Sequence, residues 1–131
     1  MRLLLDTHIA IWAILDSPRL PARARELIED PRNEIIISAA TIWEIAMKHM
    51  LARGSPNDMP ISAREAIGYF DDAGFELLDV SSAHAAEVES LPPLHGDPFD
   101  RMLVAQALAV PLRLMTHDPG VAAYSDLVIL V

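Results

Sequence analysis

Four acidic residues occupy positions where a carboxylate is costly unless it has a task. Asp6 directly follows the apolar run Arg2 to Leu5, and Asp118 follows a second apolar run near the end of the chain. Glu44 falls on the apolar stripe of a predicted helix, and Asp100 stands just before a helix-forming apolar segment. Because a charge in apolar surroundings needs a partner, these four acids are the candidate site residues.

Carboxylates that converge in one place repel one another unless protons or a cation compensate their charge. Mg²⁺ prefers oxygen ligands and keeps several waters, so a group of carboxylates together with a substrate phosphate suits it. The five histidines form no H-E-x-x-H zinc motif, and the chain has no cysteine to supply a thiolate. The residue types therefore predict a binding site for a hard divalent cation that acts on a substrate phosphate.

Each acid also has a structural interpretation. The DPFD segment fits a helix start, with Asp97 at the N-cap and Asp100 in the first turn, where the helix dipole favours negative charge. A T-x-x-E pattern ending at Glu44 matches a capping box, and Asp118 before proline fits a turn or a cap. Asp6 is the hardest to explain structurally, because an acid at the end of an inner strand has few structural duties.

Weaker candidates surround the acids. Thr7 and Thr116 could hydrogen-bond a carboxylate or a phosphate, although threonine at a strand exit is commonly a local cap. Arg101 could meet a phosphate or pair with an acid. Three histidines fit surface or loop positions better than contact with a substrate, and two tryptophans fit a core or an interface better than a platform for stacked bases: His8, His95, His117, Trp12 and Trp43.

Short apolar runs alternate with helical patterns and predict the elements that position these residues. Near-continuous apolar stretches predict strands at 2–5, 34–37, 75–78, 112–115 and 127–130. Helical periodicity covers 8–15, 21–30, 40–53, 62–73, 81–89 and 98–110. The alternation predicts an α/β fold around a mostly parallel sheet, in which Asp6 and Asp118 lie at carboxyl ends of strands, where ligands bind. At 131 residues and without a linker, the chain is expected to form one domain, residues 1–131.

Composition limits the class of partner. A net charge of −9 argues against a broad basic face for nucleic acid, but a metal-dependent nuclease stays possible because bound ions reverse the sign at the site. No apolar stretch approaches the roughly 20 residues that span a bilayer, and no long apolar segment follows Met1 as in a signal peptide. We therefore expect a cytoplasmic protein with no membrane partner. The segment 40–53 is apolar nearly all round, which favours an interface with another subunit or partner as its cover.

The motifs LLLDTH (3–8), SAATIWEIAMK (38–48), HGDPFDRMLVAQA (95–107) and MTHD (115–118) together resemble the PIN domain family, in particular the VapC toxins of type II toxin-antitoxin pairs. The similarity covers essentially the full chain, and DPFDRMLVAQA is its most specific part. It implies a three-layer α/β/α sandwich with a mostly parallel sheet of four to five strands, and a homodimer. It further implies an endoribonuclease that depends on Mg²⁺ or Mn²⁺ and is inhibited by a VapB-like antitoxin.

The resemblance also assigns roles by motif. The catalytic and metal-binding acids of the family match Asp6, Glu44, Asp100 and Asp118, and its small hydroxyl residue before the last acid matches Thr116. Asp97 matches the DPFD pattern and keeps its capping interpretation, and Thr7 stays a supporting residue. Ions held by these acids would activate water to cleave an RNA phosphodiester and leave 5′-phosphate and 3′-hydroxyl ends.

Two other classes compete with this interpretation. A phosphoacceptor domain resembling response-regulator receivers is also a small α/β domain with acids at strand ends, but receivers carry a late lysine, whereas the single lysine here is the central Lys48. A catalytically silent PIN-like binding module, kept for its interface, is disfavoured by the presence of all four acids.

Overall fold

The strands form one all-parallel sheet. In the computed structural model, which describes residues 1–131, the strand order is β3-β2-β1-β4-β5. The strands are β1 (Arg2–Leu5), β2 (Glu34–Ser38), β3 (Glu76–Leu78), β4 (Arg113–Thr116) and β5 (Val128–Leu130). The chain first proceeds outward from β1 to β3 and then returns to pair β4 with the other edge of β1. Such a reversal of strand order opens a crevice outside the carboxyl ends of β1 and β4.

Seven helices connect the strands. They are α1 (Thr7–Ile14), α2 (Ala22–Glu29), α3 (Ala39–Met50), α4 (Ala63–Asp72), α5 (Ser82–Glu87), α6 (Pro98–Ala109) and α7 (Pro119–Ala122), with a 3₁₀ turn η1 (Val88–Ser90) after α5. The predicted helices all occur, with ends shifted by a few residues. Helix α7 was not predicted, because a four-residue segment that begins with a proline is too short to show helical periodicity. None of the helices is long and apolar enough to cross a membrane.

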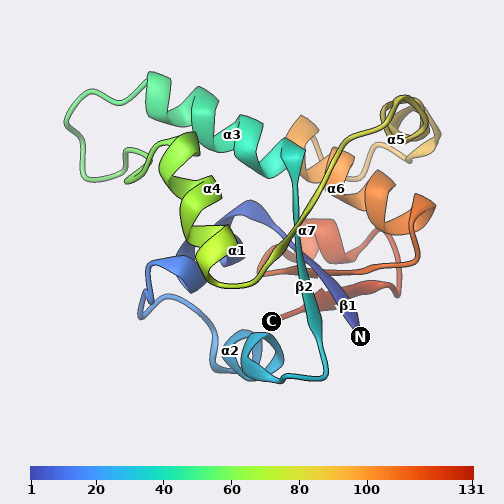
Figure 1. Cartoon of the computed structure of the whole chain (residues 1–131). Helices are drawn as coiled ribbons and strands as arrows, with labels where there is room; N and C mark the ends of the chain where they lie inside the picture. The colour runs from blue at the N-terminus through green and yellow to red at the C-terminus, as the bar shows by residue number, and fades with distance from the viewer.

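The sheet separates two hydrophobic cores, which gives the predicted three layers. Leu3 and Leu5 of β1 belong to the core beneath α1, α2 and α4, together with the buried Phe70. Leu4 points to the other face and joins the core beneath α6 and α7, which includes Leu103. Figure 1 shows α1 and α4 on one side of β1 and β2, with α5 and α6 on the other. Because successive residues of β1 serve opposite cores, its sequence is apolar without interruption.

Several helices begin where a strand ends, with almost no loop between them. Asp6 separates β1 from α1, and its side chain accepts a hydrogen bond from the N–H of Ile9. Ser38 ends β2 and caps α3, while Asp118 follows β4 and caps α7. The N-termini of these helices therefore gather at the carboxyl edge of the sheet, where their dipoles favour negative charge.

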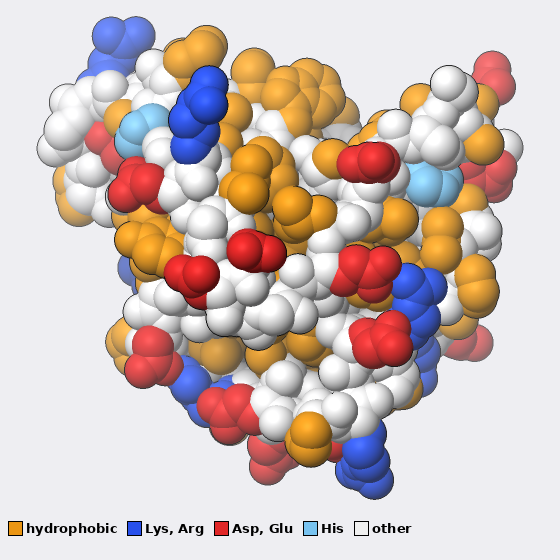
Figure 2. Space-filling view, in the orientation of Figure 1, with side chains coloured by type: hydrophobic (Ala, Val, Ile, Leu, Met, Phe, Trp, Pro, Cys, Tyr) orange, Lys and Arg blue, Asp and Glu red, His pale blue; other side chains and the backbone are white.

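Helix α3 is less buried than its sequence suggests. Its inner face contributes Ala40 and Ile45 to the two cores, whereas Trp43 is 60% and Met50 is 75% exposed. Figure 2 shows hydrophobic side chains along the upper edge of the molecule, over this helix. Within one chain, α3 thus leaves uncovered the apolar face for which the sequence analysis expected a subunit or partner.

Candidate active site

Asp6 lies at the carboxyl end of β1 with both of its oxygens held. Oδ2 accepts a hydrogen bond from the Thr116 hydroxyl at 2.5 Å, and Oδ1 accepts one from the N–H of Ile9 at 2.9 Å. The expectation that Asp6 has few structural duties is therefore wrong, because it is the N-cap of α1. Burial raises its pKa above the usual 3.8, while the bond from Thr116 opposes that rise.

Glu44 is buried and held by two polar partners. Thr7 donates a hydrogen bond to its Oε1 at 2.6 Å, and Lys48 Nζ lies 2.5 Å from its Oε2. The predicted capping box is wrong, because Ser38 caps the helix and Glu44 lies further along it. Since Thr7 directly follows Asp6 in the chain, this pair extends the acidic site from β1 toward α3.

Asp100 and Asp118 meet around a histidine. Nε2 of His95 lies 2.8 Å from Asp100 Oδ2 and 3.6 Å from Asp118 Oδ2. One ligand atom from each of these three residues lies within 4.8 Å of the others. The sequence favoured a loop or surface position for His95, and the structure confirms the loop, but it places the side chain partly buried between two acids. Its position in the HGDPFD motif was the one available signal.

The environment of Asp100 raises its pKa from the ordinary 3.8 to about 6. Burial is the largest cause, and the charges of Asp97 and Asp6 add to it. The hydrogen bond with His95 acts in the opposite direction. The site thus holds more negative charge than its surroundings stabilise, which is the condition for binding protons or a cation.

Asp97 and Arg101 have structural contacts. Asp97 is the N-cap of α6 and accepts hydrogen bonds from the backbone N–H groups of Phe99 and Asp100, as the capping interpretation predicted. Arg101 contacts no acid and instead donates to the carbonyl of Pro92 and to the hydroxyl of Tyr124. The same hydroxyl accepts a bond from the backbone N–H of His95. Arg101 therefore holds the segment that presents His95, together with Tyr124, a residue that the sequence did not single out.

Gly120 keeps the space beside the His95 cluster open. Its N–H donates to Asp118 Oδ1 at 2.8 Å. A Cβ at this position would lie 3.1 Å from both Asp118 Oδ1 and His95 Nδ1, so a larger residue would press on both side chains. Two carboxylates and an imidazole that converge in this way suit a divalent cation such as Mn²⁺, which accepts nitrogen as well as oxygen ligands.

The structure brings the predicted residues to one edge of the sheet in two adjoining groups. The first contains Asp100 and Asp118 with His95, and Asp6 is close enough for its charge to act on Asp100. Thr116 joins Asp6 to Asp118, because its hydroxyl also accepts a bond from the Asp118 N–H. The second group contains Glu44 with Thr7 and Lys48.

The sheet order and the acids at its carboxyl edge define the class of protein. It is an α/β domain in which acidic side chains converge at one edge of a parallel sheet. The family model of the PIN domain matches residues 3–127. Ribonuclease VapC16 of Mycobacterium tuberculosis is 32% identical over 83% of this chain and 69% of its own length. The chain therefore belongs to the PIN domain family and is of the VapC type, which confirms the resemblance drawn from its motifs.

Solved structures share the fold at lower sequence identity. VapBC2 of Rickettsia felis, bound to a DNA fragment from its promoter, matches with a TM-score of 0.68 and 18% identity over 100% of this chain and 98% of that one. A toxin-antitoxin complex from Klebsiella pneumoniae matches with a TM-score of 0.63 and 20% identity over 97% and 95% of the two chains. These similarities confirm the α/β/α sandwich.

The raised pKa of Asp100 predicts how the stability of the cation-free protein depends on pH. The folded state holds the Asp100 proton more tightly than the unfolded state, so this group lowers the free energy of unfolding as pH rises from about 4 to about 6. Asp100→Asn removes that loss. Relative to wild type, the variant should gain roughly 1 to 3 kcal/mol between pH 4 and pH 7.5, at 1.36 kcal/mol per pKa unit. Urea unfolding in EDTA measures the difference, and a constant offset across this range would contradict the assigned pKa.

Proposed function

We propose that the chain is a metal-dependent endoribonuclease toxin of a toxin-antitoxin system, with residues 1–131 acting as one domain. The observation that carries the proposal is the convergence of Asp6, Asp100 and Asp118 with His95 at the carboxyl edge of the sheet. The name of the relative VapC16, a ribonuclease, supports RNA as the substrate. Phosphodiester hydrolysis is the chemistry for which such a donor set is suited.

Mg²⁺ or Mn²⁺ would be held by Asp100, Asp118 and His95, with Asp6 beside them and Glu44 completing the acidic site. A bound cation supplies charge compensation for the phosphate and lowers the pKa of water. The chain's own residues supply the positioning. Thr116 fixes the orientation of Asp6, and the pair of Thr7 and Lys48 fixes Glu44.

The reaction is hydrolysis. Water adds to the phosphorus, the P–O3′ bond breaks, and the 3′ oxygen takes up a proton, which leaves 5′-phosphate and 3′-hydroxyl ends. Attack by the ribose 2′-hydroxyl would need a separate general base and acid. His95 contacts two acids, while His8 and His117 pack on Trp12, so none of these histidines is paired with another for that task.

Cleavage of total RNA by the purified, antitoxin-free chain tests the proposed activity. Wild type should cut in Mg²⁺ or Mn²⁺ and not in EDTA, and Asp100→Asn should lose at least about a hundredfold in rate, because the main cation ligand is gone. Mapping the ends of the fragments should give 5′-phosphates. Equal activity in the variant or in EDTA would contradict the proposal, and products with 2′,3′-cyclic phosphates would contradict the mechanism. No cleavage under any condition would favour the silent binding module.

His95 gives the cation site a nitrogen donor that can be seen spectroscopically. Pulsed EPR of bound Mn²⁺ should show coupling to an imidazole ¹⁴N in wild type, and His95→Ala should abolish it and weaken Mn²⁺ binding by about tenfold or more. His49→Ala is the matched control, because His49 is exposed at the far end of α3. Absence of the ¹⁴N signal from wild type would show that the cation binds without His95.

We further propose a VapB-like antitoxin as partner. The solved structures that share the fold include VapBC2 of Rickettsia felis and a toxin-antitoxin complex from Klebsiella pneumoniae, and the acidic site suits a basic side chain as inhibitor. An antitoxin arginine in this site would replace the cation. Titration with Mn²⁺, followed by EPR of the bound ion, should then show weaker binding by the complex than by the free chain.

The proposed homodimer uses the exposed apolar face of α3. Trp43, Met47, Met50 and Leu51 are all exposed there, and Trp43 packs edge-on against Phe99 with ring centroids 5.1 Å apart. Sedimentation of wild type at micromolar concentration should give a dimer, and Met50→Glu should shift it toward monomer by burying an unpaired charge. Ile67→Glu is the matched control, because Ile67 is exposed on α4. A monomeric wild type would refute this arrangement.

A further inference from the structure

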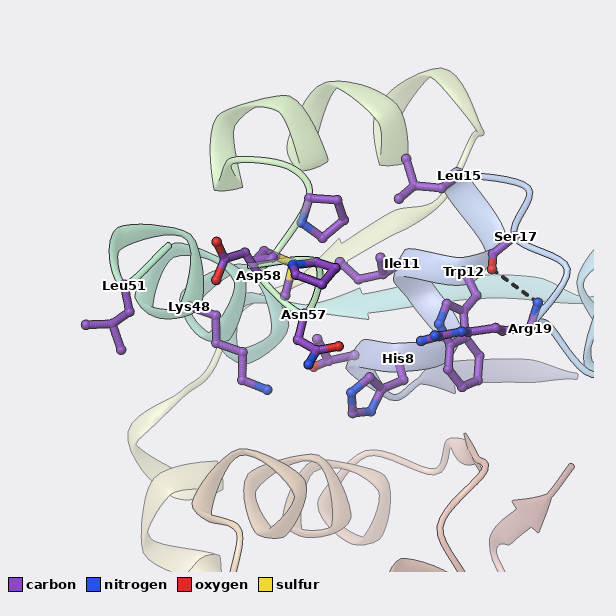
Figure 3. Close-up of a pocket in the computed structure, with 14 residues that line it drawn as sticks. His8, Ile11, Trp12, Leu15, Ser17, Arg19, Lys48, Leu51, Asn57 and Asp58 are labelled. Carbon is purple, nitrogen blue, oxygen red and sulfur yellow. Dashed lines mark hydrogen bonds between the residues drawn. The ribbon is translucent and has the colours of Figure 1, made fainter. Parts of the chain in front are cut away.

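A pocket of about 510 Å³ opens beside the acidic site. Its walls are α1 with the segment that follows it to Arg19, the end of α3, and the loop 56–60, and it meets the site at Thr7. Figure 3 shows His8, Ile11 and Trp12 on one wall, with Lys48 and Asn57 facing them from α3 and the loop. The volume lies within the roughly 300 to 1,000 Å³ of small-ligand pockets, which is sufficient for a nucleotide.

The pocket gathers positive charge on an acidic protein. Lys48, the only lysine in a chain of net charge −9, lines it together with Arg19. The one acid on its wall, Asp58, is occupied, because its Oδ2 accepts backbone N–H groups of Arg53, Gly54 and Ser55 at 2.7 to 2.9 Å. Asp58 therefore shapes the loop. Lys48 is paired with Glu44, whereas Arg19 has no carboxylate partner, so Arg19 is the cation of the pocket that suits a phosphate.

The pocket also offers aromatic surface and one amide. His8 and Trp12 lie one helical turn apart on α1, with ring centroids 5.7 Å apart and planes tilted by 32°. The sequence favoured a core or an interface position for Trp12. Its side chain packs against the core but is only partly buried, and its remaining surface faces the pocket. Asn57 projects toward His8 in Figure 3, and its amide can both donate to and accept from a base edge.

We propose that this pocket binds one nucleotide of single-stranded RNA, next to the nucleotide whose phosphate is cleaved. Its base would lie against Trp12 and its phosphate near Arg19. This inference rests on the proposed ribonuclease function and adds the site that selects unpaired RNA. Lys48 connects the pocket to the acidic site, because it lines the pocket and contacts Glu44 of the acidic site. A basic antitoxin segment is a poorer occupant, since the unpaired Arg19 would repel it.

Direct binding tests the pocket separately from catalysis. The protein carries Asp100→Asn, so that the strand stays intact in Mg²⁺, and Trp43→Phe, so that Trp12 is the only tryptophan. A synthetic hexanucleotide RNA of mixed sequence should quench Trp12 fluorescence, because stacked bases quench indole. The same sequence as a duplex should quench it much less, since paired bases cannot enter the pocket.

Affinity for the same RNA, labelled with fluorescein, gives the second measurement. In the Asp100→Asn background, Trp12→Ala should weaken binding by about 5- to 150-fold, the range found for loss of one base stack, while Trp12→Phe should stay within about threefold. Tyr69→Ala, which removes an exposed aromatic side chain of α4 outside the pocket, should leave the affinity unchanged. Circular dichroism and thermal unfolding show that each variant is folded, and Trp12→Phe keeps the test valid if Trp12→Ala is unstable.

The outcomes separate the two proposals. If wild type cleaves RNA but RNA neither quenches Trp12 nor depends on it for affinity, the pocket inference is wrong and the ribonuclease stands. If wild type neither cleaves nor binds RNA, both fail. Quenching by an arginine-rich antitoxin peptide together with no quenching by RNA would assign the pocket to the antitoxin and overturn the inference.

Discussion

The hydrogen bond from Thr116 to Asp6 joins the two strands on which the site depends. It links the carboxyl ends of β1 and β4, 110 residues apart in sequence, and holds a buried carboxylate whose desolvation would otherwise be costly. These strands are adjacent only because the strand order reverses around β1. The site therefore cannot form without this sheet topology.

In the proposed site, the same acids serve both the structure and the chemistry. Asp6, Asp97 and Asp118 each cap a helix, and capping fixes where their remaining lone pairs point. Capping and metal binding, which the sequence posed as alternatives for Asp118, are therefore compatible there, and they are equally compatible at Asp6. A capped carboxylate is oriented before any ligand arrives, which reduces the cost of binding a cation.

Charge is distributed unevenly around this edge of the molecule. Carboxylates converge on one side, and the single lysine separates them from a pocket lined by aromatic and cationic groups. A cation would reverse the sign of the acidic side. A negatively charged strand could then pass from the pocket across the acids, although the chain as a whole carries a net charge of −9. The overall charge is thus a poor guide to a nuclease of this class.

The sequence by itself determined the five strands, every helix except α7, and the family, because apolar periodicity, cap residues and strand exits are local signals. Only the tertiary structure decided which side chains meet. The contact of His95 with Asp100 and Asp118, the pairing of Glu44 with Thr7, and the surroundings of Arg101 each join separate segments. Such contacts depend on the order of the strands and on the path of the loops, and neither can be predicted from the spacing of residues in the sequence.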